Sequence, residues 1–375
     1  MKNIQNRVLF LLKRSEYDYD HAGRLLKTKH QIGNQSEILM SELAYDNLGR
    51  LTSKKLHDNT EIINYTYNIR NWLKSINSPR FQETLYYQDG TTALYNGNIS
   101  QMDWKVLQES HSHRYTFSYD GLNRLTDAVY DRGFGVSYVN TNYFNESMSY
   151  DKHGNILSLN RYMQVTNMSQ LVNNMGYNYS GNQVTSINDY SYIGAPLNNG
   201  LQIFQKAHSY RPEEYIYDAN GRMTVDYNKG IAKIQYNSLN LPKKMQFLPG
   251  HILEYGYDAL GGKRTEISTA AVTGINVPMG TIKPLYSWEV LYSSQRDYCG
   301  NVVYGGNGTH VLQLQTPEGY ARRDYVGSGD WVYFYTLKDH LGSVRSEFST
   351  SSNWTPGFTH YYPVAFYVKS ACFLP

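Results

Sequence analysis

A seven-residue phrase recurs along most of this 375-residue chain. It consists of Tyr, then Asp or Asn, two variable residues, Gly or Asn, Arg or Asn, and an aliphatic residue, as in YDNLGRL at 45–51. Close copies begin at Tyr19, Tyr45, Tyr119, Tyr150 and Tyr217, and looser copies begin at Tyr67, Tyr95, Tyr179, Tyr236 and Tyr257. The mean step of about 26 residues is typical of a repeat architecture. This period argues against an ordinary enzyme.

Each copy of the phrase predicts a β-hairpin. The residues before it alternate between apolar and polar, as in 61–67 and 114–119, which is the pattern of a half-buried strand. The Asp side chain can bond the backbone two residues on, and the Gly or Asn tolerates a positive φ. An aliphatic residue such as Leu51 then starts the return strand.

We assign a structural role to the motif residues of the five close copies. Their aspartates are expected to lie near arginines of adjacent turns, as exposed ion pairs of small individual value. These residues are Tyr19, Asp20, Gly23, Arg24, Tyr45, Asp46, Gly49, Arg50, Tyr119, Asp120, Asn123, Arg124, Tyr150, Asp151, Gly154, Tyr217, Asp218, Gly221 and Arg222.

The predicted fold class is all-β. A single hairpin is barely stable in water, so neighbouring hairpins must pair edge to edge in a continuous antiparallel sheet. Because sheets twist with a fixed hand, the sheet should curl into a spiral. We expect a loop excursion in the long gap between Tyr179 and Tyr217, smaller ones at 160–176 and 270–285, and a first strand at 8–12. Open strand edges predict poor solubility in isolation.

The composition excludes several classes of protein. The chain has 37 Tyr against 12 Phe and 5 Trp, which suits half-buried sheet faces. A net charge of +3 without a long Lys/Arg run argues against nucleic-acid binding. The two cysteines, Cys299 and Cys372, can form at most one bridge. The sequence contains neither a signal-peptide pattern nor a stretch of transmembrane length.

These phrases resemble those of the RHS/YD-repeat family over roughly residues 17–265. A second signature strengthens the resemblance: residues 297–304 and 335–345 look like the opening of the RHS repeat-associated core, with DHLGSVR at 339–345 as its most specific phrase. The resemblance implies a repeat array at 1–290 and the start of the core at 291–375. The core-motif residues are Asp339, His340, Leu341, Gly342 and Arg345.

The resemblance implies a hollow β-cocoon, often carried on exported bacterial polymorphic toxins, that encloses a C-terminal toxin domain. Relatives in animals are cell-surface adhesion proteins. After 360–363 the family usually continues with Phe-Gly, whereas this chain reads Val364-Ala365 and ends at Pro375. The Asp-Pro-x-Gly phrase near the family's self-cleavage site is missing. We therefore expect a truncated shell segment, secreted or on the cell surface as part of a longer protein, and assign self-cleavage to no residue.

The sequence gives little support for a catalytic or metal-binding site. Asp339 and His340 could be drawn as an acid–base pair, but neighbouring strand residues point to opposite faces, so a turn-and-pairing role is expected. His111 and His113 share one face of a strand, yet two ligands make a poor zinc site, and a solvated pair is expected. The motif aspartates come one per repeat, too sparse for a calcium loop. No catalytic residue, cofactor or metal is predicted.

The predicted function is a non-catalytic shell segment whose partner is a C-terminal toxin or cargo domain of the full-length protein. The alternative is a module that binds carbohydrate or a cell-surface receptor through the aromatic face of the sheet. A hydrolase built from scattered His and Asp residues ranks last.

Overall fold

The structure is a computed structural model that describes residues 13–135, 137–191, 211–306, 308, 310–324, 329–351, 354, 357–363 and 366–368. Within these ranges the chain forms antiparallel β-sheets and one three-residue helix, η2 (Ser287–Glu289), which confirms the all-β fold class. None of the helical structure in these ranges is long and apolar enough to cross a membrane. The first strand expected at 8–12 lies outside the described residues.

The first sheet has 15 strands, and most pair with the strand that follows in sequence, as tandem hairpins require. Strand β11 branches off β10, which also pairs with β12. The strands are β1 (Lys13–Tyr19), β2 (Leu25–Ile32), β3 (Ile38–Tyr45), β4 (Leu51–Leu56), β5 (Glu61–Tyr67), β6 (Leu73–Asn77), β7 (Phe81–Tyr86), β8 (Gln101–Val106), β9 (Ser112–Tyr119), β10 (Leu125–Phe134), β11 (Ser137–Asn140), β12 (Glu146–Tyr150), β13 (Ile156–Val165), β14 (Met168–Ser180) and β15 (Gln183–Asp189).

The second sheet has 13 strands in sequence order, and a two-stranded hairpin follows it. Strands on both sides of residue 290 belong to this sheet, and the division at 290/291 stays a prediction. The strands are β16 (Tyr215–Tyr217), β17 (Met223–Asp226), β18 (Ile231–Tyr236), β19 (Pro242–Phe247), β20 (Ile252–Tyr257), β21 (Lys263–Ala271), β22 (Val290–Cys299), β23 (Val302–Gly305), β24 (His310–Thr316), β25 (Gly319–Arg323), β26 (Trp331–Lys338), β27 (Val344–Ser349), β28 (Gly357–Phe358), β29 (His360–Tyr362) and β30 (Phe366–Val368).

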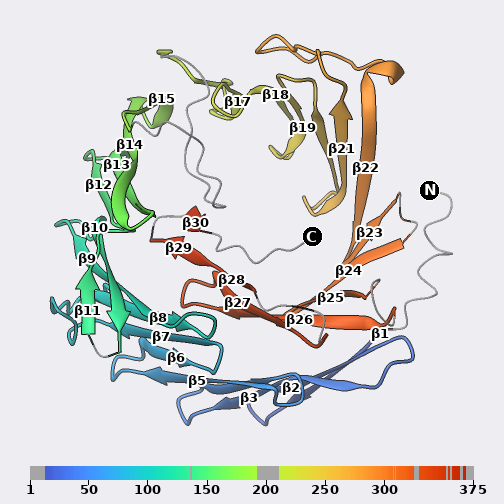
Figure 1. Ribbon diagram of the computed structural model, residues 1–375. Coiled ribbons are helices and arrows are strands. Elements are labelled where there is room, and N and C mark those ends of the chain that lie inside the picture. The colour runs from blue at the N-terminus through green and yellow to red at the C-terminus, as the bar shows by residue number, and fades with distance from the viewer. Residues whose placement is uncertain are drawn as a thin grey trace.

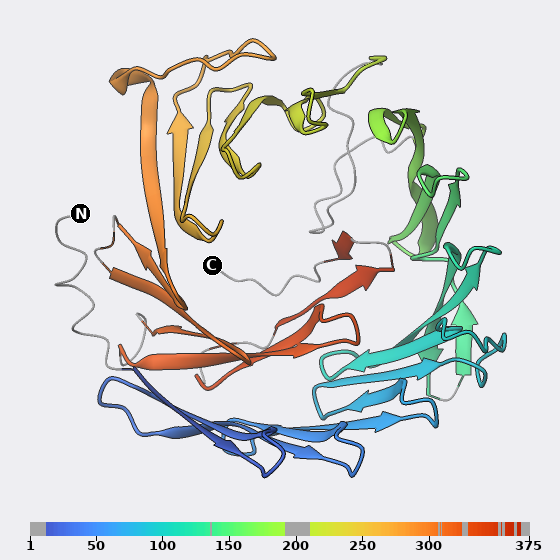
Figure 2. The same cartoon turned by 180° about the vertical axis from the view of Figure 1, so that it is seen from behind.

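The two sheets follow one curved wall that curls round as an open spiral, so that its last strands overlap its first (Figure 1). Strands β25–β28 run along the inner side of the first strands of the chain, and β29 and β30 lie further inside the curl (Figures 1 and 2). The wall is not one continuous sheet, because it divides between β15 and β16. There the Glu214 N–H donates to the Thr185 carbonyl at 2.7 Å, and the Ile187 N–H donates to Glu214 Oε2 at 2.9 Å.

The expected loop excursions have different outcomes. Residues 272–286 connect β21 to β22 without a strand, as predicted. Residues 160–176 instead lie mainly in the hairpin of β13 and β14, so the excursion predicted there is wrong. The segment resembles a loop in sequence because it is polar, but its polar groups are paired: Arg161 Nε donates to Glu146 at 2.6 Å, and Asn173 Nδ2 donates to Asp189 at 2.7 Å. The middle of the 179–217 gap lies outside the described residues.

The hydrophobic core lies where the beginning and the end of the wall overlap. It combines buried side chains of the first sheet, such as Phe81 and Trp104, with Tyr335 and Phe348 of the second. Strands β7 and β9 alternate between buried and less buried positions, so one face of each turns toward the inner layer. Strand β26 is buried on both faces along most of its length, which agrees with its nearly continuous apolar sequence. The overlap therefore joins the first sheet to the last strands of the second sheet.

Candidate functional site

The repeated turn is closed mainly by the carboxylate of its aspartate. Asp20 Oδ1 accepts the backbone N–H groups of Ala22 at 2.8 Å and Arg24 at 2.9 Å, and Oδ2 accepts Nε–H of Arg24 at 2.6 Å. The backbone N–H of Arg24, followed by its side chain, holds the pKa of Asp20 below its usual value despite some desolvation. The same pattern recurs, with Asn155 in place of arginine in one copy, at Asp46, Asp120, Asp151 and Asp218.

The Asp–Arg ion pairs form within one turn, so the expectation that they would join adjacent turns is wrong; the arginine reaches the next turn through other groups, as where Arg124 donates to the Asp151 carbonyl at 2.6 Å. The arginine is held four residues from its aspartate because the turn brings these two positions together. Its guanidinium then lies over the motif tyrosine of the following repeat, at 5.0 Å for Arg24 on Tyr45 and 4.7 Å for Arg124 on Tyr150. Such contacts contribute roughly 0.5–1 kcal/mol at exposed sites.

Most motif tyrosines also bind back to the preceding repeat through the hydroxyl. Tyr45 donates to the Leu25 carbonyl at 3.0 Å, and Tyr150 donates to the Leu125 carbonyl at 2.8 Å. Seven more tyrosines donate in the same way to a carbonyl of an earlier strand or its flanking segment: Tyr67, Tyr87, Tyr119, Tyr179, Tyr217, Tyr236 and Tyr257. These tyrosine hydroxyls thus hold neighbouring hairpins together.

The Gly or Asn of the turn adopts the left-handed conformation that the motif implies. Gly154 has φ 92°, and Asn123 has φ 62°. Gly154→Ala should lower the free energy of unfolding by about 1–2 kcal/mol, because a Cβ is disfavoured at this φ although no atom lies within 4 Å of it. Gly121→Ala is the matched control: its site is equally open and its φ is not positive, so it should cost much less. Equal losses in denaturant titrations would contradict this prediction.

The phrase at 339–345 forms the same turn in a buried setting. Asp339 Oδ1 accepts the N–H groups of Leu341 at 3.0 Å and Ser343 at 2.9 Å, and Gly342 has φ 84°. Asp339 Oδ2 accepts Nε–H of Arg345 at 2.7 Å, and 1% of the Asp339 side chain and 5% of the Arg345 side chain are exposed. The arginine now stands six residues after the aspartate and points into the overlap between layers.

His340 does not act with Asp339; it binds the outer layer. Its backbone N–H donates to Oε2 of the buried Glu83 on β7 at 3.0 Å, and its Nδ1 lies 3.1 Å from Oε1. His340 lies in the turn after β26, so the argument from opposite faces of a strand does not apply to it. Because both oxygens of Asp339 are occupied by the turn and Arg345, this geometry supports a turn-and-pairing role for the phrase.

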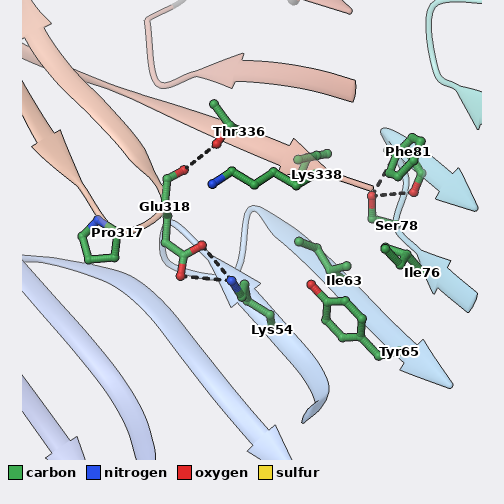
Figure 3. A pocket seen from close by; sticks show the side chains of 11 residues that line it. Lys54, Ile63, Tyr65, Ile76, Ser78, Phe81, Pro317, Glu318, Thr336 and Lys338 are labelled. Carbon is green, nitrogen blue, oxygen red and sulfur yellow. Dashed lines mark hydrogen bonds and ion pairs between the residues drawn. The ribbon is translucent and has the colours of Figure 1, made fainter. Parts of the chain in front are cut away.

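Polar contacts continue along the overlap. His30 and His57 of the outer layer lie 2.9 Å and 3.1 Å from the hydroxyls of Tyr333 and Tyr335, respectively. Lys54 pairs with Glu318 at 2.9 Å beside a cleft of about 90 Å³, shown in Figure 3. Ligand pockets usually enclose roughly 300 Å³ or more. This cleft is therefore too small for a typical substrate.

His30 makes the stability of the overlap depend on pH. Burial, followed by the charge of Lys13, lowers the pKa of His30 from 6.5 to about 4. Between these values the unfolded chain binds a proton that the folded chain does not, so stability should fall as the pH drops from about 6.5 to about 4. His30→Gln should make this decline shallower in denaturant titrations across pH 3.5–7.5. Parallel curves for the variant and the wild type would contradict the prediction.

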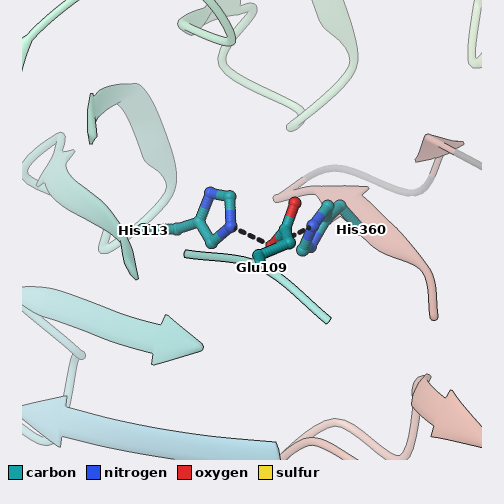
Figure 4. A group of neighbouring side chains, drawn as sticks. All are labelled: Glu109, His113 and His360. Carbon is teal, nitrogen blue, oxygen red and sulfur yellow. Dashed lines mark hydrogen bonds and ion pairs between the residues drawn. The ribbon is translucent and has the colours of Figure 1, made fainter. Parts of the chain in front are cut away.

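A cluster of Glu109, His113 and His360 joins the two layers near the inner end of the wall (Figure 4). Glu109 follows β8, His113 lies on β9, and His360 begins β29. Glu109 Oε2 lies 2.6 Å from Nε2 of His113 and 3.0 Å from Nε2 of His360. Burial opposes ionisation of Glu109, but the hydrogen bonds from the two histidines outweigh it and lower its pKa.

The expectation of a solvated histidine pair is wrong for His113. The residue is 3% exposed, its ring stacks on Trp104 at 4.9 Å, and burial lowers its pKa to about 4. His111 is only partly exposed and lies 3.9 Å from Glu109 Oε1. The spacing of Glu109, four residues before His113, could have indicated a third member of the group. His360 could not have been found, because the overlap brings it from 251 residues away.

Solved structures of toxin complexes contain chains with a similar fold. The chain is similar to part of the Photorhabdus luminescens Tc holotoxin pore with a mutation in TccC3, with TM-score 0.65 and 14% identity over 95% of this chain and 17% of that chain. It is also similar to the crystal structure of TcdB2–TccC3, with TM-score 0.53 and 14% identity over 95% of this chain and 18% of the other.

These likenesses show a shared fold. The present chain spans less than a fifth of the length of these structural neighbours. No family model matches the sequence, and no curated protein matches it.

Proposed function

We propose that this chain is a non-catalytic segment of an encapsulating shell, in an exported protein of the RHS/YD-repeat type. The repeated turns support this proposal, because their aspartates, arginines and tyrosines are engaged in joining one hairpin to the next. The fold shared with Tc toxin chains supports it as well. The partner would be a C-terminal toxin or cargo domain, and the full-length protein would be secreted or displayed at the cell surface.

The position of the last strands is the observation that carries the proposal. Strands β29 and β30 lie inside the curl, with β25–β28 and the outer layer between them and the surroundings on one side (Figures 1 and 2). Tyr362 anchors this segment by donating its hydroxyl to the Tyr162 carbonyl at 2.7 Å. A domain that continued from β30 would therefore begin its path within the curved wall.

A protease-accessibility experiment tests the proposal. One flexible peptide with a protease site would be attached after Pro375 of the full chain, and the same peptide would be attached before Met1 in a second protein. Since β1 belongs to the outer layer and β30 lies inside the curl, cleavage after Pro375 should be several-fold slower. Equal rates in the folded proteins would overturn the enclosing role, and urea should abolish any difference.

A second candidate function, carbohydrate or receptor binding, rests on aromatic residues outside the motif. Tyr286 and Trp288 stack at 4.7 Å on the connection between β21 and β22, and they are 60% and 73% exposed. The motif tyrosines are less suited to binding, because their hydroxyls and ring faces contact neighbouring repeats. Binding on a glycan array that Trp288→Ala abolishes would favour this function, and a blank array would count against it.

A further inference from the structure

We propose that Glu109, His113 and His360, with His111 beside them, form a zinc site that fastens the inner end of the wall to the outer layer. Imidazole nitrogen and carboxylate oxygen are ligands that Zn²⁺ favours. The ligand atoms of the first three residues lie within 4.8 Å of one another. This inference does not depend on the shell function. The sequence alone predicts no metal because it indicates only His111 and His113 as ligands, without Glu109 and His360.

The distances require only small movements. Ligand atoms around a tetrahedral zinc ion are roughly 3.3 Å apart, given bonds of about 2.0–2.1 Å. The carboxylate oxygen of Glu109 lies 2.6 Å and 3.0 Å from the two Nε2 atoms, so these two separations would have to lengthen by roughly 0.7 Å and 0.3 Å. His111 Nε2 lies 3.9 Å from the other oxygen of Glu109, so it is the nearby candidate for a fourth ligand and would have to move toward the other three.

The surroundings are those of a structural site. Only 4% of the His113 side chain and 15% of the Glu109 and His360 side chains are exposed. A metal-bound imidazole Nε2 requires the proton on Nδ1, where a hydrogen-bond acceptor should receive it. His113 meets this requirement, because its Nδ1 lies 2.6 Å from the Tyr130 hydroxyl, which can accept as well as donate.

Zinc binding through His360 competes with the hydrogen bond that His360 accepts from Trp104. The indole Nε1–H of Trp104 donates to Nδ1 of His360 at 3.1 Å, so His360 carries its proton on Nε2 and directs it at Glu109. When Nε2 of His360 binds zinc, its proton must move to Nδ1. Two N–H donors then face each other, so the hydrogen bond from Trp104 must break. Zinc should therefore change the environment of Trp104, and removing the indole N–H should strengthen zinc binding.

The first test measures unfolding of the chelator-treated full chain with and without Zn²⁺. Zinc should raise the midpoint of thermal unfolding of the wild type, and His360→Ala and Glu109→Gln should lose this increase. His153→Ala is the matched control, because its side chain is 67% exposed in the turn between β12 and β13, and its response to zinc should equal that of the wild type. A wild-type midpoint that zinc leaves unchanged, or an equal shift in His360→Ala, would overturn the proposal.

The second test does not depend on the stability of the ligand variants. Trp104→Phe keeps all the ligands and removes the competing donor, so calorimetric titration with Zn²⁺ should give roughly 2- to 10-fold tighter binding than the wild type. Co²⁺ in place of zinc should produce the visible absorption of a tetrahedral site in both proteins. Weaker zinc binding by Trp104→Phe, or Co²⁺ spectra of a fully hydrated ion, would contradict the assigned geometry.

Discussion

Asp339→Ala should lower the free energy of unfolding by about 3–5 kcal/mol, because it leaves a buried guanidinium without its counter-ion. The Arg345 guanidinium lies 5.4 Å from the ring centre of Trp104 and 5.0 Å from that of Tyr361, and only 5% of its side chain is exposed. The substitution also removes the acceptor of two backbone N–H groups in the turn. Equilibrium unfolding in urea measures the loss.

Two further variants make this test specific. Asp46→Ala removes the same hydrogen bonds from an exposed copy of the turn, and its effect should be much smaller because water can solvate Arg50. The double variant Asp339→Ala/Arg345→Met removes both buried charges and should recover part of the loss. If Asp339→Ala costs no more than Asp46→Ala, burial of the pair does not govern its contribution.

Phe348→Ala should weaken the contact between the two layers and lower the free energy of unfolding by about 3–5 kcal/mol. The ring is 2% exposed, stacks on Tyr335 at 5.0 Å and lies under the guanidinium of Arg80 at 5.0 Å. The replacement leaves a cavity where the inner strands meet the outer ones. Hydrogen exchange should become faster in β26 and in the facing strand β7, and it should remain unchanged in β13 and β14.

The matched control is Phe134→Ala at the end of β10, where the ring is 58% exposed. Its free energy of unfolding should stay within about 0.5 kcal/mol of the wild-type value. If Phe348→Ala accelerated hydrogen exchange equally in all strands, the two layers would unfold as one unit. That result would contradict the prediction that the contact between the layers opens locally.

Local structure was predictable from the sequence, and the overlap was not. The alternation before Tyr67 and the Asp, Gly and aliphatic positions after Tyr45 indicate a hairpin, because turns and pleats depend on neighbouring residues. The partner of Arg24 was assigned to the wrong turn, since only the closed geometry shows that the side chain four residues away is nearest. The buried position of His113 also escaped prediction.

The contacts that sequence reasoning missed join residues far apart in the chain. Glu83 and His340 are 257 residues apart, and no local pattern marks either of them as a partner. Their pairing depends on the accumulated twist of the intervening strands and on the break between β15 and β16. A prediction of curvature could anticipate that the wall curls round to overlap itself, but not which strands would meet.

The overlap between layers also fixes an order of events during synthesis. His30 and Tyr333 are 303 residues apart, so the apolar face of the first strands emerges long before the strand that covers it. At about 5–20 residues per second this interval lasts roughly 15–60 s. Proteolysis of ribosome-bound chains should therefore find β2–β9 open to attack until β26 has left the ribosome. Early release should lead to aggregation, because the apolar face of the first strands is then uncovered.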